Sequence, residues 1–475
     1  MNTKPMLPIL ALAISVMPLA QAGDSIPPGS IRIFYVQQNL EGEVPSNPVL
    51  ESAAKPDENM KSSGRILVDT TQRFQTMKGI GAAFSEIGTL ALAGLPAESR
   101  DDLLKNLFDV KGGAGLSFCR LPVGASDFAT SAFSYAETPE DYELKDFSLA
   151  RDEKSIIPAV QAALKINPAM SLFASPWSPP GWMKESGKMD GGGEKSRLRD
   201  EGRVYAAYAL YLERYIQGYR AKGIPIERLC PQNEVDMNPV YPGCIMKPDQ
   251  MVKLVTGYLA PQFQASKIPT EIWPGTFREK ANQKATVLWA TECMKDDGFR
   301  AVSAGLGIQY YDGQPVQSLK VQYPGLRLMH TEAKCDGGKN TANEAKGRLP
   351  EMIGHFQVGC DNYCYWNMLL DENQKSGWNW KQNSLVTIDR TTGKVRYNPD
   401  YQPIFLASKF VRPGAVRVFS DYRKPNAAFE DKDKNITILV QGGKEAERVD
   451  LIVDGKKCSI QLPASSDCAI VIKKP

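Results

Sequence analysis

Two short acidic segments contain the residues best suited to chemistry. Glu234 ends the run Pro231-Gln232-Asn233-Glu234, and Glu332 lies in His330-Thr331-Glu332-Ala333, each at the end of an apolar, β-rich run. Two carboxylates delivered by separate strand ends can cleave a glycosidic bond, one acting as acid/base and the other as nucleophile. Glu234 and Glu332 are therefore the candidate catalytic pair.

Eight β-rich runs, separated by segments of helical periodicity such as 204–220, must position this pair. The runs are residues 78–84, 117–124, 171–177, 227–234, 271–276, 305–311, 326–333 and 362–368. This alternation predicts an α/β fold, a (β/α)₈ TIM barrel, in which the active site lies at the C-terminal ends of the strands. Glu234 and Glu332 close the fourth and seventh runs, so we expect them to meet across the barrel mouth.

The two ends of the chain have a different pattern. Residues 31–36, 415–419, 436–440 and 469–472 alternate between apolar and polar or are rich in β-branched residues, which is typical of antiparallel strands. Because these segments flank the barrel, we expect one β-sandwich side domain formed by both chain ends. The predicted boundaries are 23–76 and 412–475 for this domain and 77–411 for the barrel.

The first 22 residues resemble a signal peptide. Lys4 precedes a largely apolar stretch from Leu7 to Leu19, and Ala20-Gln21-Ala22 provides a small-x-small cleavage site. The apolar stretch is shorter than the roughly 20 residues that span a bilayer. We therefore predict cleavage near Gly23 and a secreted or periplasmic protein.

Composition narrows the classes of function. The 475 residues carry a net charge of only +3, from 57 Lys+Arg and 54 Asp+Glu, so we expect no nucleic-acid partner. With just two histidines there is no His-rich cluster for a catalytic zinc, and we predict no metal and no cofactor. Export would allow disulfides among the nine cysteines, and Cys458 with Cys468, which bracket a hairpin-like segment, is the best candidate pair.

Several other residues have the chemistry to hold a sugar. Asn233 suits a sugar 2-hydroxyl, and Asp127 can accept hydrogen bonds from two adjacent hydroxyls. Indole faces pack on the C–H face of a pyranose, which makes Trp177 and Trp366 candidate platforms. Trp182, in the same Pro-rich segment as Trp177, fits the core and the site equally well.

Ordered motifs across nearly the whole mature chain resemble glycoside hydrolase family 30, most closely its glucosylceramidase branch. They include Lys78-Gly79-Ile80-Gly81-Ala82-Ala83-Phe84, Arg120-Leu121-Pro122-Val123-Gly124, Ser126-Asp127-Phe128, Tyr135-Ala136-Glu137-Thr138-Pro139, Ala174-Ser175-Pro176-Trp177, Gln232-Asn233-Glu234, Thr331-Glu332-Ala333 and Trp366-Asn367. The resemblance implies a retaining β-glycosidase with Glu234 as acid/base and Glu332 as nucleophile. It also implies a sugar site of Asp127, Trp177, Asn233, Tyr311, Trp366 and Asn383, tied together by Arg120.

Some segments depart from that branch. Gln309-Tyr310-Tyr311 stands where the branch has His-Trp-Tyr, which predicts an amide instead of an imidazole near the nucleophile. Loop 371–380 differs as well, and such loops select the aglycone. The resemblance implies a glycolipid such as glucosylceramide as the partner, with peripheral contact to lipid surfaces. The alternatives are an endo-β-1,6-glucanase or related polysaccharide hydrolase acting on an oligosaccharide, and a non-catalytic carbohydrate-binding barrel.

Overall fold

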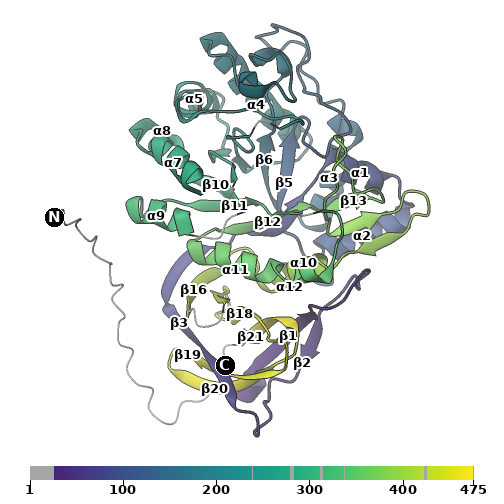
Figure 1. The fold of residues 1–475 in the computed structure, drawn as a ribbon, viewed down its shortest axis with the longest axis vertical. Coiled ribbons are helices and arrows are strands. Elements are labelled where there is room, and N and C mark those ends of the chain that lie inside the picture. Colours follow the sequence, from purple (N-terminus) through teal and green to yellow (C-terminus); the bar gives the residue numbers. More distant parts are fainter. Residues whose placement is uncertain are drawn as a thin grey trace, which may run out of the picture.

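The structure is a computed structural model that describes residues 26–237, 239–278, 283–310, 314–335, 337–421 and 425–473. The predicted signal peptide, residues 1–22, and the predicted sugar-binding residue Tyr311 lie outside the described residues. Figure 1 shows a barrel with its covering helices above a smaller, strand-rich domain.

Parallel strands form the centre of the barrel. They are β4 (Gly79–Ala83), β5 (Phe118–Val123), β6 (Ser171–Pro176), β7 (Arg228–Leu229), β8 (Glu271–Ile272), β10 (Leu306–Gln309), β11 (Leu328–Glu332) and β12 (Asn362–Asn367), with β9 (Phe277–Arg278) beside β10. They pair in the orders β12-β4-β5-β6-β7-β8 and β11-β10-β9. Backbone bonds from Ala304 to Ile272 (2.9 Å) and from Ala333 to Cys364 (3.0 Å) connect these two groups. The ring of strands confirms the predicted barrel.

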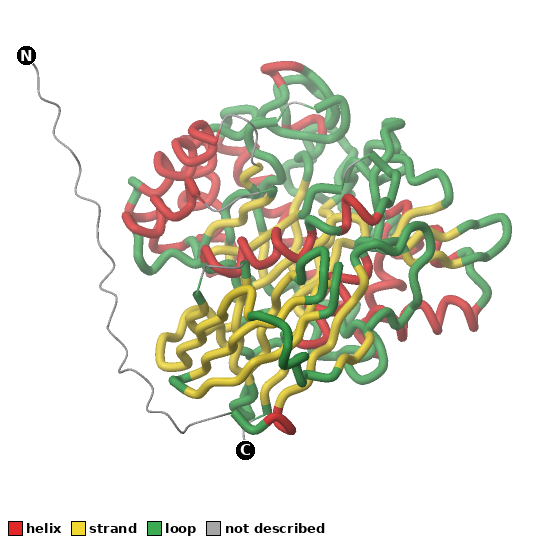
Figure 2. Tube along the Cα trace, turned by 60° about the horizontal axis from the view of Figure 1, so that its bottom comes forward, coloured by secondary structure: helices red, strands yellow, loops and turns green. Residues whose placement is uncertain are grey.

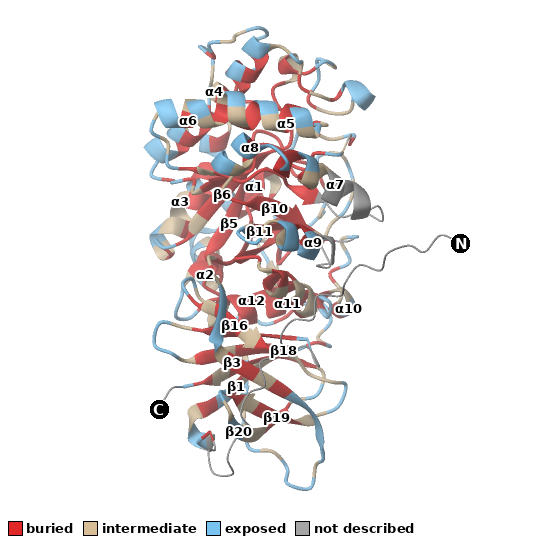
Figure 3. Ribbon diagram, turned by 90° about the vertical axis from the view of Figure 1, so that its left-hand side faces the viewer, coloured by how far each residue is buried: buried red, intermediate tan, exposed pale blue. Residues whose placement is uncertain are grey.

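Helices cover the outside of this ring, and Figure 3 shows buried strands inside helices whose outer faces are exposed. The helices are α1 (Glu86–Ala93), α2 (Ala97–Phe108), α3 (Ile156–Ile166), α4 (Gly202–Ala221), α5 (Pro248–Leu254), α6 (Ala260–Ala265), α7 (Gln283–Met294), α8 (Asp297–Val302), α9 (Gln314–Gln322), α10 (Ala342–Ala345), α11 (Arg348–Val358) and α12 (Tyr401–Phe410). A π-helical turn (Val255–Leu259) joins α5 to α6, and 3₁₀ turns occur at Pro28–Ser30, Asp152–Lys154, Gly181–Met183 and Gly193–Lys195. Among the described residues, no helix has both the length and the apolar character needed to cross a membrane.

Helix α4 shows how the sequence pattern sets this packing. Tyr208, Tyr211, Tyr215 and Tyr219 recur at three- and four-residue spacing, and all four are fully buried. That spacing places them on one face of a helix. The face packs inward, so the helix predicted at 204–220 is confirmed.

The side domain contains a nine-stranded sheet in the order β2-β1-β21-β18-β17-β16-β3-β19-β20. Its strands are β1 (Ile31–Gln37), β2 (Leu50–Ser52), β3 (Ser62–Thr76), β16 (Val416–Ser420), β17 (Asn426–Glu430), β18 (Ile436–Gln441), β19 (Glu447–Val453), β20 (Lys456–Leu462) and β21 (Ser466–Ile472). The sheet has its own apolar core. Figure 2, in which the bottom of Figure 1 comes forward, shows its curved strands in yellow. Both chain ends contribute strands, as predicted; the exact domain boundaries stay a prediction. A small sheet of β13 (Leu369–Asp371), β14 (Val386–Ile388) and β15 (Val395–Tyr397) flanks the barrel.

Helices α11 and α12 join the two parts. Phe410 of α12 stacks on Phe34 of β1 with ring centroids 4.5 Å apart, and Phe356 of α11 meets Phe429 of β17 edge-on at 5.5 Å. The side-chain amide of Gln357 also donates to the backbone of Asn426 (2.7 Å). Aromatic contacts from two helices therefore hold the side domain against the barrel.

The predicted Cys458–Cys468 disulfide is wrong. All nine cysteines are free thiols, and Cys458 and Cys468 lie on strands that are not neighbours. Strand β20 pairs with β19 at one edge of the sheet, whereas β21 lies between β1 and β18. The short segment between the two cysteines looked like a hairpin in sequence, but its two strands pair with different partners.

Candidate active site

Arg120, on β5, is the centre of the candidate site. Its side chain is fully buried, and its guanidinium carbon lies 4.5 Å from the ring centroid of Trp177 and 5.4 Å from that of Trp366. The guanidinium donates to Glu332 Oε2 (2.6 Å) and to Asn233 Oδ1 (2.6 Å). It also donates to Ser175 Oγ at 2.7 and 3.0 Å. One buried cation thus joins residues from three other strand ends.

Glu332 is the last residue of β11 and is only 4% exposed. Its Oε2 forms the salt bridge with Arg120, and its Oε1 accepts a hydrogen bond from the Tyr310 hydroxyl. Tyr310 follows directly after β10, with a positive φ of 54° that turns the chain out of the strand. The two donors hold both oxygens of the predicted nucleophile.

Asn233 and Glu234 follow strand β7, which is shorter than predicted. Its ladder ends at Leu229, but single backbone bonds from Asn233 to Pro176 (2.8 Å) and from Thr276 to Gln232 (2.7 Å) keep the segment between its neighbours. Glu234 has a φ of 45°, in the left-handed region that side chains rarely adopt. Such strain persists where the surroundings hold it and clusters at functional sites.

The Glu234 carboxylate is 6% exposed, and each of its oxygens accepts a hydrogen bond. Gln309, at the end of β10, donates from Nε2 to Oε1 at 2.8 Å, and the Tyr241 hydroxyl donates to Oε2 at 3.2 Å. Gln309 is the register partner of Glu332 in the β10–β11 ladder, so it lies near the nucleophile as predicted. Its amide, however, bonds to the predicted acid/base. Sequence order placed it correctly at the sixth strand end but could not show which carboxylate it faces.

Asp127 shows that the acidic groups converge on one space. The residue is 6% exposed, and its Oδ1 has no hydrogen-bond partner among the residues that the structure describes. Burial raises the pKa of the Asp127 carboxyl well above its ordinary value, and the negative charges of Glu332 and Glu234 raise it further. A neutral Asp127 with an unused oxygen is suited to a sugar hydroxyl.

The aromatic candidates divide into two groups. Trp177 and Trp366 stack on each other at 4.9 Å and are 2% and 1% exposed, so they form the wall behind Arg120. Trp182 instead packs edge-on against Tyr142 at 5.3 Å and donates to the Ala136 carbonyl (2.9 Å). The contacts of Trp182 therefore belong to a neighbouring loop and not to the carboxylate cluster.

Asn383 lies beside the site in a network of its own. Its Oδ1 accepts from the backbone of Asn340 (3.0 Å), its Nδ2 donates to Glu344 (3.0 Å), and its carbonyl accepts from Asn367 (3.2 Å). Among the described residues, these bonds hold the loop that follows β12 and do not reach Arg120 or the carboxylates. The sugar-binding role of Asn383 stays a prediction.

Three partly exposed aromatic residues form the rim. Tyr241, which bonds to Glu234, packs against Trp380 with ring centroids 4.8 Å apart. Trp378 points its indole N–H at Asp190 (3.4 Å), and the neighbouring Gly377 donates to the Asp127 carbonyl (3.2 Å). None of these rim aromatics was predicted, because they lie in loops without a strand-end position to mark them.

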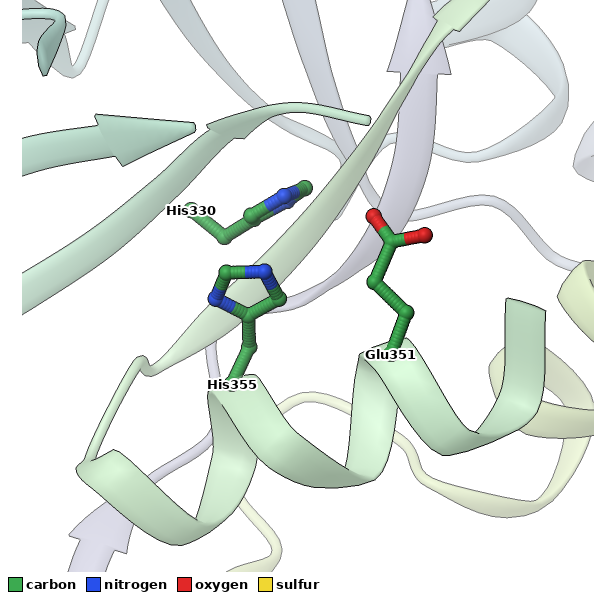
Figure 4. A group of neighbouring side chains, drawn as sticks. All are labelled: His330, Glu351 and His355. Atoms are coloured by element: carbon green, nitrogen blue, oxygen red, sulfur yellow. The ribbon is translucent and has the colours of Figure 1, made fainter. Parts of the chain in front are cut away.

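The two histidines come together despite their separation in sequence (Figure 4). One ligand atom each from His330, Glu351 and His355 lies within 4.8 Å of the others. However, His330 Nδ1 accepts the Cys364 N–H (3.2 Å), and Glu351 is ion-paired with Arg348 (2.5 Å). That acceptor role puts the proton on Nε2 of His330. A cation would have to shift this tautomer and lie beside a guanidinium, so we treat the group as a packing contact between α11 and the strands.

A ring of parallel strands with acidic residues converging at its mouth defines the class of (β/α)₈-barrel glycoside hydrolases. Residues 77–383 match the Glycosyl hydrolase family 30 TIM-barrel domain, and the chain belongs to this family. It is a glycoside hydrolase, as the sequence predicted.

Similar proteins cover much of the chain. The putative glucosylceramidase 3 of Caenorhabditis elegans is 27% identical over 439 residues, covering 87% of this chain and 81% of the relative. The endo-1,6-beta-D-glucanase of Neurospora crassa is 26% identical over 369 residues, covering 75% of each chain. The crystal structure of SrfJ from Salmonella typhimurium matches with a TM-score of 0.82 and 23% identity, covering 94% of this chain and 100% of that chain, and shares the fold.

Proposed function

We propose that this chain is an exported, retaining β-glycosidase that hydrolyses glucosylceramide or a similar β-glucoside by double displacement. The observation that carries the proposal is the guanidinium of Arg120, which joins Glu332 to Asn233 directly beside Glu234. Such an arrangement gives Glu332 a fixed cation, whereas the donors to Glu234 within the described part of the chain include the neutral Gln309 and Tyr241. The two carboxyl groups therefore have environments suited to different roles.

Each carboxylate has one task in each half of the reaction. An oxygen of Glu332 attacks the anomeric carbon while Glu234 gives its proton to the glycosidic oxygen, so the bond to the leaving group breaks. Glu234 then takes a proton from water, the water oxygen bonds to the anomeric carbon, and Glu332 is released. In this proposal Asn233 bonds the sugar 2-hydroxyl, and Asp127 bonds another hydroxyl.

Similarity to a putative glucosylceramidase supports the lipid glucoside as substrate. The second candidate is a β-1,6-linked glucan, supported by similarity to an endo-1,6-beta-D-glucanase. The rim supports this second candidate, because Tyr241 and Trp380 are packed, partly exposed aromatic side chains beside Glu234 that could stack on a further sugar. A non-catalytic role fits less well, since binding alone does not need two buried carboxylates held by so many donors.

The substrate experiment compares fluorescent glucosylceramide in detergent micelles with a β-1,6-gluco-oligosaccharide, with Glu332→Gln as the blank. Faster turnover of the lipid supports the first candidate, and turnover of the glucan alone supports the second. Absence of turnover on either would contradict both and favour a binding protein. N-terminal sequencing of exported protein tests the secreted or periplasmic location, which requires a start near Gly23.

A further inference from the structure

The side chain of Gln309 forms a buried hydrogen bond to the Glu234 carboxylate. The side chain is completely buried, and its Nε2 donates to Glu234 Oε1 at 2.8 Å. Its own oxygen lies 2.5 Å from the Thr276 hydroxyl, which is nearer to it than to Asn233 Oδ1 at 3.0 Å. The Thr331 hydroxyl lies 3.4 Å away and has its shorter bond, 3.1 Å, to the Ile308 carbonyl. Every polar atom of this amide therefore has a partner.

These partners fix which way the amide points. A hydroxyl can donate to the amide oxygen, while a carboxylate oxygen can only accept from the amide nitrogen. Turning the amide over would set its oxygen against Glu234 Oε1, so that two acceptors faced each other. Thr276 is itself positioned, because its Oγ accepts the backbone N–H of Glu234 (3.2 Å). The amide nitrogen of Gln309 therefore faces Glu234.

We propose that Gln309 is a positioning residue that confines the catalytic proton of Glu234 to Oε2; this rests on the proposed acid/base role of Glu234. An amide N–H is a donor at every pH, so Oε1 stays an acceptor. The Tyr241 hydroxyl beside Oε2 can rotate to accept instead of donate, so the carboxyl proton resides on Oε2. Oε2 faces the Tyr241 hydroxyl on the rim side. The same oxygen then gives the proton to the glycosidic oxygen and later takes one from water.

The ionisable groups near Glu234 do not take over the donor role of Gln309. Burial raises the pKa of Tyr241 and of Tyr310 well above the ordinary value, so both hydroxyls stay neutral. The further ionisable groups among the described residues are Asp127, whose pKa is also raised by burial, and Glu332, whose charge is paired with Arg120. An imidazole in place of the amide would be a donor or an acceptor depending on its tautomer.

Gln309→Leu tests the proposal with two aryl β-glucosides, one with a good leaving group (dinitrophenyl) and one with a poor one (phenyl). For the poor leaving group we expect kcat/KM to fall about 10- to 100-fold, the size of one hydrogen bond to a charged group. For the good leaving group, which needs little protonation, we expect a loss under about threefold. The alkaline limb of kcat/KM moves to higher pH, because ionised Glu234 has lost a donor.

Two further variants separate positioning from packing. Gln309→His restores an N–H donor and is expected to recover most of the loss, and Thr276→Val, which frees the amide to turn over, gives the same pattern at smaller size. The matched control is Gln402→Leu, a buried glutamine of α12 that donates to the Gln37 carbonyl (3.0 Å) far along the chain from the site. The control leaves the leaving-group ratio and the pH profile unchanged.

Equal losses on both glucosides with an unmoved alkaline limb would overturn the proposal and assign Gln309 a packing role. Glu234→Gln, measured on the same substrates, separates this failure from a failure of the proposed function. If Glu234→Gln spares the good leaving group and Gln309→Leu does not, only the inference about Gln309 fails. If Glu234→Gln lowers both equally, the acid/base assignment itself fails.

Discussion

Among the described residues, two arginines on barrel strands, Arg120 and Arg228, are fully buried, and their surroundings differ. Arg228, at the start of β7, is fully buried with Trp273 and Phe118 at 4.2 and 5.2 Å, and binds Asp361 through two bonds of 2.7 and 2.9 Å. Arg120 is equally buried among aromatic rings but divides its bonds among Glu332, Asn233 and Ser175.

The difference separates stability from function. At the bottom of the barrel, the Arg228 guanidinium binds both oxygens of Asp361, with Glu271 3.4 Å away as a further ion-pair partner, which is the geometry of a structural charge cluster. At the mouth, Glu332 and Asn233 share the Arg120 guanidinium. Asp127 has an oxygen without a partner among the described residues, so this cluster has an acceptor available for a ligand. Residues at the strand C-termini of such barrels serve catalysis, and those at the other face serve stability.

The largest effect is expected from Glu332→Gln. Loss of the nucleophile lowers kcat by about 10⁴-fold or more on any β-glucoside. Steady-state assays measure this, with Glu430→Gln, a buried side-domain glutamate paired with Arg73 and Lys434, as the matched control. The control keeps kcat within about twofold. Residual turnover above about one per cent in Glu332→Gln would remove the residue from the nucleophile role.

Arg120→Met tests the mouth side of the comparison. Without the guanidinium, Glu332 and Asn233 lose their shared donor, and we expect kcat to fall about 10²- to 10³-fold. Circular dichroism and urea unfolding show whether the fold survives. A variant that folds and keeps more than about a third of wild-type kcat would show that Arg120 is structural, like Arg228.

Arg228→Met tests the bottom of the barrel and is expected to have the opposite profile. Removing one partner leaves Asp361 buried without its main cation, which lowers the free energy of unfolding by about 3–5 kcal/mol. The kcat of the folded fraction stays within about threefold of wild type. Urea unfolding and activity on the same preparation measure both quantities; a large drop in kcat with unchanged stability would reverse the comparison.

Asp467 extends the comparison to a buried carboxylate that has glutamine amides instead of a guanidinium. Gln38 and Gln441 donate to its Oδ1 at 2.8 and 3.0 Å, and burial raises the pKa of Asp467 to about 6. A raised carboxyl pKa means that the folded state binds the proton more tightly than the unfolded state. This contribution to stability is present below about pH 4 and is lost as the pH rises to about 6, by roughly 2–3 kcal/mol.

Asp467→Asn removes the charge, so the variant should lack this part of the pH dependence. Urea unfolding of both proteins between about pH 4 and pH 7 measures it. The variant is expected to gain stability relative to wild type as the pH rises. A constant difference across this range would show that Asp467 does not titrate there.

The smallest effect concerns the thiols. With nine free cysteines, a reductant is expected to change Tm by less than about 1 °C, since no disulfide is there to constrain the unfolded chain. Alkylation without reductant, followed by mass spectrometry, should modify Cys458 and Cys468 in the unfolded protein. If Cys458 and Cys468 both resist alkylation until reductant is added, the two residues form a disulfide after all.

The regular parts of the molecule were predictable because they repeat. Apolar runs ending in polar residues gave the ring of strands, and their order gave the meeting of Glu234 and Glu332. The strand predicted at 227–234 was too long, however, because its ladder ends at Leu229 and only single bonds continue beyond it. Side-chain direction at such a junction depends on backbone turns like that of Glu234, which a periodic pattern does not contain.

Contacts between loops were not predictable. Tyr241 reaches Glu234 from a loop, and Gln309 faces a different carboxylate from the one expected. His330 and His355 likewise meet only because α11 packs on β11. Each of these contacts joins segments that are distant in the chain, so spacing in one sequence carries no signal for them.

The most direct test of the central claim is to trap the glycosyl-enzyme. A 2-deoxy-2-fluoro-β-glucoside with a good leaving group slows release more than attack, and peptide mass spectrometry then locates the sugar. The structure predicts one fluoroglucosyl group per chain on Glu332, with no labelling of Glu332→Gln. Labelling of another residue, or continued turnover without any covalent label, would contradict the double-displacement mechanism and the assigned nucleophile.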